Sequence, residues 1–134
     1  MSDDDDELLA EFLVEGRENL DRLERELLAF EGVASAEMIA AVFRTAHTVK
    51  GTAGFFGFTK LQHLMHTAES LLSRIRDGEL SLTSPMVSCL LDVTDAARDI
   101  LNSLEARAGE GDADLAPLVA QLVAFGAYTP GAEP

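Results

Sequence analysis

The sequence has no tryptophan, one tyrosine and one cysteine among its 134 residues. A single cysteine, Cys89, excludes an internal disulfide framework, and its place in an apolar pattern indicates a core residue. No apolar run reaches the roughly 18 residues of a membrane-spanning helix. The acidic start, MSDDDDE, is unlike a signal peptide. These absences predict a cytoplasmic protein with an aliphatic interior and no membrane insertion.

Basic charge is also scarce. Ten Lys and Arg residues stand against 24 Asp and Glu residues, so the formal net charge is −14. Nucleic acids and anionic membranes both require a basic face, so we expect the protein to bind neither. We interpret the acidic residues as a well-solvated surface. The alternative is that their negative field helps to select partners and sets the rate of encounter.

Apolar residues recur in steps of three and four along five segments, which is typical of amphipathic helices. The first predicted helix begins at Asp3–Asp6 and ends at Gly32, with an apolar seam along one face. The second follows an N-cap at Ser35 and ends near Gly54. The seam of the first helix consists of Leu9, Leu13, Gly16, Leu20, Leu23, Leu27 and Phe30. The stripe of the second consists of Ile39, Val42, Ala46, Val49 and Ala53.

The third and fourth predicted helices also have start signals. Thr59 and Gln62 have the spacing of a capping box, and Gly78 ends the third helix. Ser84, followed by a proline, is the expected N-cap of the fourth helix, which stops at Gly109.

A shorter fifth helix is predicted from Asp114 to Phe125, with Pro117 in its first turn. The sequence contains no strand pattern, internal repeat or low-complexity block. We therefore predict an all-α fold, an antiparallel four-helix bundle with an appended fifth helix. Residues 1–126 form one domain, and residues 127–134 are interpreted as a linker to further parts of a longer protein.

The stretch from Phe43 to Phe58, FRTAHTVKGTAGFFGF, combines a histidine and a lysine with three glycines. An interior glycine costs a helix about 1 kcal/mol relative to alanine. Lys50, Gly51 and Gly54 all fall within about 60° of His47 around the predicted helix. The residue four positions ahead would cover a helical side chain, and here it is Gly51. The pattern predicts an exposed imidazole with an ammonium group beside it.

A short turn joins the second and third helices, so they should be antiparallel neighbours. That arrangement brings Glu69 and His66 of the third helix towards His47 and Lys50. A carboxylate that accepts a hydrogen bond from one ring nitrogen fixes the tautomer and raises the basicity of the other nitrogen. We assign this role to Glu69, expect Lys50 to pair with it, and expect His66 to orient it through a hydrogen bond.

An oriented nucleophile beside a cation suits phosphoryl transfer to nitrogen. The sequence has no glycine-rich phosphate loop and no evident Mg²⁺ site, so we expect this domain to bind neither ATP nor Mg²⁺ itself. A receiving protein must close around the imidazole, which predicts contact with the outer face of the second helix. Its expected partner-binding residues are Arg44, Thr48, Gly51 and Gly54.

The run AHTVKGTAGFFGF, with LQHLMHTAES after it and RDGEL further on, resembles the histidine phosphotransfer (HPt) domain of the chemotaxis kinase CheA family. The resemblance is specific between Phe43 and Leu80, and elsewhere it is a matter of helical pattern. It implies that His47 is the phosphorylated histidine and that His66 and Glu69 orient it. The motif around the histidine is matched by Thr48, Lys50 and Gly51.

The resemblance also implies partners. A separate CheA-type kinase domain would phosphorylate His47 from ATP, and an aspartate on a response-regulator receiver, CheY-like or CheB-like, would take the group. The domain would not be an enzyme by itself, would be a monomer in isolation, and would lie at the N-terminus of its parent. Related folds also serve phosphorelays outside chemotaxis.

Two other classes of function stay open at the level of sequence. A metal-binding bundle could use His47, His63, His66 and Glu69 as ligands, although Lys50 would place positive charge beside the metal. A pure interaction bundle would make the histidine incidental. His63 falls where members of the resembled family often have a polar or acidic residue, and we assign it no role.

Overall fold

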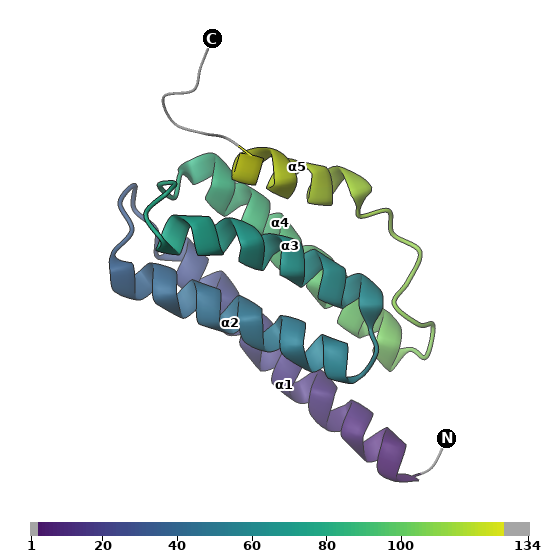
Figure 1. Ribbon diagram of the computed structural model, residues 1–134. Coiled ribbons are helices and arrows are strands. Elements are labelled where there is room, and N and C mark those ends of the chain that lie inside the picture. Colours follow the sequence, from purple (N-terminus) through teal and green to yellow (C-terminus); the bar gives the residue numbers. More distant parts are fainter. Residues whose placement is uncertain (1–2, 128–134) are drawn as a thin grey trace.

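The computed structural model describes residues 3–127, which form five α-helices and, within that range, no strand. The helices, shown in Figure 1, are α1 (Asp3–Leu28), α2 (Ala36–Phe55), α3 (Thr59–Arg76), α4 (Ser84–Glu105) and α5 (Ala116–Ala127). The prediction of an all-α fold is confirmed. None of these helices is long and apolar enough to cross a membrane. Most of the predicted linker, residues 128–134, lies outside the described part of the chain.

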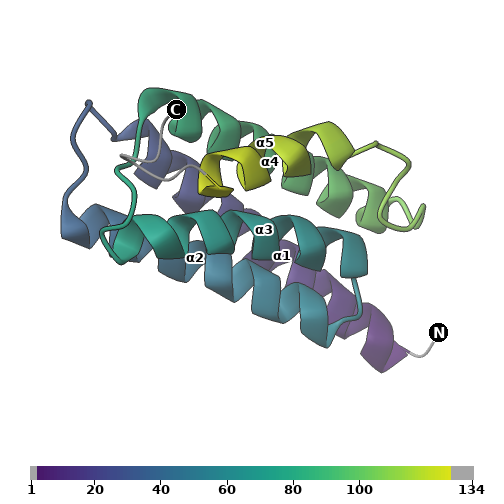
Figure 2. The same ribbon diagram turned by 45° about the horizontal axis from the view of Figure 1, so that its top comes forward.

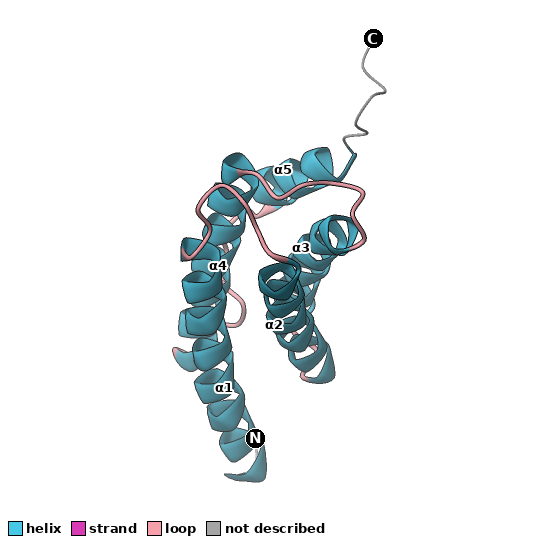
Figure 3. Cartoon of the chain, turned by 90° about the vertical axis from the view of Figure 1, so that its left-hand side faces the viewer, coloured by secondary structure: helices cyan, strands magenta, loops and turns pink. Residues whose placement is uncertain are grey.

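The first four helices form two layers. In the view of Figure 3, α1 lies beside α4 and α2 lies beside α3. Contacts between α2 and α3 are the most extensive in the molecule, and contacts between α1 and α2 join the layers. The fifth helix packs across α3 and α4 (Figure 2), on the side away from α1 and α2. The predicted bundle with an appended helix is therefore the observed architecture.

The core is aliphatic, and α1 approaches α4 closely at a glycine. A Cβ atom at Gly16 would lie 3.1 Å from Leu101 Cδ1, so glycine at this position allows the close approach. Phe12, which the predicted seam of α1 omitted, is buried. Its ring lies 4.9 Å from that of Phe56 and 5.1 Å from that of Phe58, measured between centroids. Phe56 and Phe58 thus form a packed corner with Phe12, whereas Phe55, at the end of α2, is 82% exposed.

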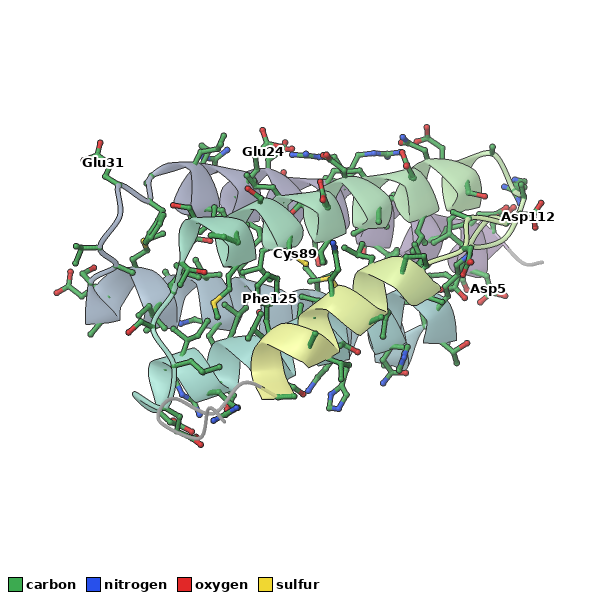
Figure 4. The ribbon with its side chains drawn as sticks, turned by 90° about the horizontal axis from the view of Figure 1, so that it is seen from above. Asp5, Glu24, Glu31, Cys89, Asp112 and Phe125 are labelled. Carbon is green, nitrogen blue, oxygen red and sulfur yellow. The ribbon has the colours of Figure 1, made fainter. Side chains whose placement is uncertain are left out.

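Cys89 is a core residue, as predicted, and it lies on α4 beneath α5 (Figure 4). Burial raises the pKa of its thiol, and the charge of Asp92 adds to this. A buried thiol with a raised pKa is mostly protonated at neutral pH, so this cysteine contributes packing and not reactivity.

The starts of α2 and α4 have side-chain caps. The Ser35 cap is confirmed, because its Oγ accepts a hydrogen bond of 3.0 Å from the amide of Met38. The N-cap of α4 is Thr83 and not Ser84, which is already the first helical residue. Thr83 has the extended backbone of a cap, and its hydroxyl accepts from the Met86 amide at 3.4 Å. Helix α4 also ends earlier than predicted, at Glu105.

The capping box predicted for α3 is wrong. Phe58 occupies the N-cap position, and its side chain makes no capping hydrogen bond. Glu110, from the loop between α4 and α5, caps the helix instead. Its carboxylate accepts from the amides of Leu61 at 2.8 Å and Lys60 at 3.3 Å. The residue that satisfies the start of α3 is therefore about 50 positions away in the chain, beyond the reach of a local pattern.

We expect Glu110→Ala to lower the free energy of unfolding by about 1–2 kcal/mol, because it removes the acceptor for two part-buried amides in the first turn of α3. Urea unfolding followed by circular dichroism measures this. Glu105→Ala is the matched control, since it removes only the 3.0 Å surface ion pair with Arg17. Such exposed pairs contribute about 1 kcal/mol or less. Equal losses in the two variants would contradict a capping role for Glu110.

Candidate functional site

His47 lies on α2 with 59% of its side chain exposed, and α3 supplies its partner. Its Nδ1 atom is 2.7 Å from Oε2 of Glu69, as the spacing across the α2–α3 turn predicted. A carboxylate only accepts hydrogen bonds, so Nδ1 carries the proton in the neutral ring and donates it to Glu69. The lone pair of the neutral imidazole therefore lies on Nε2. The geometry fixes which nitrogen can act as a nucleophile.

The second oxygen of Glu69 accepts a hydrogen bond of 2.9 Å from Lys50 Nζ. The Glu69 side chain is only 14% exposed and that of Lys50 is 21% exposed. Burial raises the pKa of the Glu69 carboxyl, but the hydrogen bonds from Lys50 and His47 and their charges outweigh it, so the net pKa is lowered. Glu69 is therefore a carboxylate at neutral pH, and it connects the imidazole to the ammonium group.

His66 is exposed and does not take the predicted role of orienting Glu69 through a hydrogen bond. Both oxygens of Glu69 are engaged by His47 and Lys50. Within residues 3–127 no hydrogen bond joins the His66 side chain to that carboxylate, so this prediction is wrong for the structure. His66 instead lines a shallow hollow of about 360 Å³ with Lys50, Thr59, Gln62 and His63.

The two helical glycines beside His47 have different surroundings. A Cβ atom at Gly51 would meet nothing within 4 Å, so this position is open towards the solvent. A Cβ atom at Gly54 would come within 2.6 Å of Gln62 Nε2. Gly54, which is half-buried, therefore allows α3 to pack closely, whereas Gly51 leaves the surface next to His47 clear.

Arg44 and Thr48 are exposed on α2, one turn before and one residue after the histidine. The Thr48 hydroxyl donates a hydrogen bond of 2.9 Å to the carbonyl of Arg44, a link within the helix. Neither side chain belongs to the cluster that Glu69 forms with His47 and Lys50, which we call the Glu69 cluster. Both are available to another molecule on the outer face of α2.

Two residues near His47 were missed at the level of sequence. The ring of Phe43 lies nearly parallel to the imidazole, with an angle of 11° and centroids 6.0 Å apart. The guanidinium carbon of Arg76 lies 4.2 Å from the centroid of the Phe43 ring. The four-residue spacing of Phe43 and His47 is a detectable signal, but nothing local points to Arg76.

The metal-site alternative would need ligands from His47, His63, His66 and Glu69. Among the described residues, no group of three or more His, Cys, Asp or Glu side chains is arranged to hold a metal ion. Both oxygens of Glu69 already accept hydrogen bonds from protein groups.

We expect Lys50→Met to raise the pKa of Glu69, because the largest of the interactions that lower it is removed. Carboxyl ¹³C NMR titration measures the change. The ordinary pKa of a glutamate carboxyl is 4.5. The stabilisation that comes from the lowered pKa of Glu69 is fully present above that pH and is lost as the pH falls through the folded pKa. Acid unfolding of Lys50→Met should therefore begin at a higher pH. Lys60→Met is the control, since the ammonium group of Lys60 donates to the Gly111 carbonyl; the same shift in both variants would contradict a specific Lys50–Glu69 pair.

Several known proteins are similar to this chain. The chemotaxis protein CheA of Bacillus subtilis is 31% identical over 122 residues, which cover 90% of this chain and 18% of that protein. The phosphorylated P1 domain of CheA3 from R. sphaeroides, solved in complex with CheY6, has a TM-score of 0.82 and 28% identity. That match covers 91% of this chain and 97% of the solved one.

The CheA phosphotransferase domain from Thermotoga maritima superimposes with a TM-score of 0.71 and 32% identity, over 74% of this chain and 95% of that one. The chain thus spans nearly all of these solved domains but a small part of the full-length relative. The sequence model of the Hpt domain family matches residues 7–122. The family resemblance that the motif around His47 indicated is confirmed, and the chain belongs to the Hpt domain family.

Proposed function

We propose that His47 accepts a phosphoryl group from ATP held by a separate CheA-type kinase domain and passes it to an aspartate of a response-regulator receiver, CheY-like or CheB-like. The observation that carries the proposal is the exposed imidazole whose Nδ1–H donates to Glu69 at 2.7 Å. That arrangement presents Nε2 to another molecule. We further propose that the parent is a cytoplasmic histidine kinase of chemotaxis, since the relatives that match include chemotaxis proteins named CheA.

In the proposed reaction, Nε2 of His47 first forms the bond to phosphorus and later releases it. The Nε2 lone pair attacks the γ-phosphorus, the bond from that phosphorus to the β–γ bridging oxygen breaks, and ADP leaves. The ring then carries positive charge and keeps its proton on Nδ1, where the Glu69 carboxylate stabilises it. In the second step an aspartate oxygen attacks the phosphorus, the N–P bond breaks, and its electrons return to Nε2. Lys50 balances the charge of Glu69 while the anionic group approaches.

A receiver must reach Nε2 with its aspartate in line, so it must touch α2. We propose the outer face of that helix as the contact, with Arg44, Thr48 and Gly51 nearest the histidine and α1 at its edge. Gly54 faces Gln62 and has less surface to offer. The expected interface is small, near or below about 1,200 Å², as in other transient complexes. Helices α4 and α5 stay free, and the domain by itself is a monomer.

Phosphorylation at His47 is the direct test. Incubation with a CheA-type kinase domain and ATP should attach one phosphoryl group, stable to base and labile to acid. His47→Gln should abolish it, because the Nε2 nucleophile is gone, while the helical content stays unchanged. His63→Gln is the matched control and should be phosphorylated normally. Mass spectrometry locates the modified residue, and phosphate on His63, His66 or a hydroxyl side chain would refute the assignment.

Gly51 tests whether access to His47 depends on an open surface. Gly51→Leu should stabilise α2 by several tenths of a kcal/mol, since leucine has the better helix propensity. It should nevertheless slow phosphotransfer by at least about tenfold, because the side chain leans towards His47 and blocks the approach of a partner. Gly51→Ala is the control: its methyl group meets nothing within 4 Å, so transfer should be nearly normal. A Gly51→Leu variant that is both stable and fully active would show that the glycine does not provide access.

A further inference from the structure

The seam between α2 and α3 extends beyond the Glu69 cluster. On α2, Phe43, His47 and Lys50 follow each other in steps of four and three, so they share one face. On α3, Glu69 and Arg76 are seven residues apart, which places them within about 20° of each other around the helix. The antiparallel helices therefore present two adjacent cross-helix contacts, Glu69 with the His47–Lys50 pair and Arg76 with Phe43.

Phe43 contacts the imidazole from the preceding helical turn. Its side chain is partly buried and packs against the hydrophobic core, which restricts its motion. The nearly parallel rings, with centroids 6.0 Å apart, have the geometry of an offset stack. Glu69 holds the imidazole at Nδ1 alone, and one hydrogen bond leaves the plane of the ring free to tilt. The stack on Phe43 limits that tilt from the N-terminal side of α2.

Arg76 places a cation at the same end of the site. Its guanidinium lies over the Phe43 ring, 4.2 Å from the centroid, in a cation–π arrangement. It also contacts Asp77 at 3.3 Å, and 43% of its side chain remains exposed. His47 therefore has Lys50 on its C-terminal side along α2 and Arg76 beyond Phe43 on its N-terminal side.

The sign of the charge on α2 and α3 is opposite to that of the protein as a whole. Helices α2 and α3 together have two acidic residues, Glu37 and Glu69, and five basic ones. The five are Arg44, Lys50, Lys60, Arg74 and Arg76. Helix α1 has eleven acidic and three basic residues, and α4 has four acidic residues and one basic residue. Glu24 marks the acidic α1–α4 edge in Figure 4. In a chain with a formal charge of −14, the basic side chains are concentrated on the layer that holds His47.

We propose that Phe43 is a positioning residue for the imidazole and that Arg76, with Arg44, forms a cationic rim that docks the acidic phosphoacceptor site of a receiver. This deepens the proposed function and rests on it. A site that holds Mg²⁺ beside an acceptor aspartate is built from carboxylates, and it is most negative before the metal binds. The rim on α2 and α3 attracts such a surface, while α1 and α4 repel it. The docking surface therefore crosses the seam onto the C-terminal end of α3.

The rim is tested with a cognate receiver whose phosphorylation is prevented by the absence of a phosphodonor. Arg76→Glu should weaken binding by about three- to tenfold at low salt, mainly through a slower association rate. The difference should shrink as salt is added. Arg25→Glu makes the same change of charge on an exposed residue in the last turn of α1. Equal effects of the two substitutions at every salt concentration would overturn the rim.

The positioning role of Phe43 needs a readout that packing alone does not change. In Phe43→Leu, ¹⁵N NMR of the imidazole should show a smaller fraction of the tautomer with its proton on Nδ1, and phosphorylation should be at least about threefold slower. Phe43→Tyr keeps an aromatic face towards both His47 and Arg76, so it should restore the tautomer and the rate. Normal tautomer populations and rates in Phe43→Leu would refute the role. A failure of Phe43→Tyr to restore both, in a protein that circular dichroism shows to be folded, would also refute it.

The unmodified chain separates this inference from the proposed function. If His47 of the unmodified chain is not phosphorylated by any CheA-type kinase domain, the proposed function fails and the inference fails with it. If His47 is phosphorylated and Arg44→Glu weakens docking while Arg76→Glu matches Arg25→Glu, only the extension onto α3 fails.

Discussion

The Glu69 carboxylate joins α2 to α3 through two hydrogen bonds, one from the imidazole of His47 and one from the ammonium group of Lys50. Burial of this carboxylate raises its pKa, and the hydrogen bonds and charges of the two donors outweigh that effect and lower the pKa below its ordinary value. The same contacts decide the state of the histidine, since an acceptor on Nδ1 leaves the lone pair on Nε2. A single side chain thus sets the tautomer of His47 and holds the ammonium group of Lys50 close to it.

That arrangement requires α3 to keep a fixed register against α2. Three contacts outside the site contribute to it. Gly54 allows Gln62 to approach α2 closely, Phe12 packs against the aromatic corner between the two helices, and Glu110 caps the first turn of α3. A helix slides in steps of about 1.5 Å per residue, so a shift by one residue would be enough to separate Glu69 from His47. The rest of the bundle therefore acts on the site by holding two helices in place.

The two layers of the bundle also differ in charge. The α1–α4 layer carries most of the acidic residues, and its ion pairs, such as Arg98 with Asp21 at 2.8 Å, lie between those two helices. The α2–α3 layer is the more basic one and holds the exposed imidazole. The proposed docking of an acidic partner rests on this distribution, since a basic layer attracts an acidic surface even in a protein whose net charge is strongly negative.

Local pattern in the sequence was sufficient to predict the helices, the exposed position of His47 and the approach of Lys50 and Glu69 to it. Steps of three and four give each helix its buried face, and a short turn forces α2 and α3 to be antiparallel, so His47, Lys50 and Glu69 had to lie near one another. Only the tertiary structure decided that Glu110 caps α3, that Arg76 lies over Phe43 and that the Glu69 carboxylate binds His47 and Lys50 without a hydrogen bond from His66. The physical reason is range: a helical period determines which residues share a face within one element, whereas contacts between distant elements depend on how the whole bundle packs.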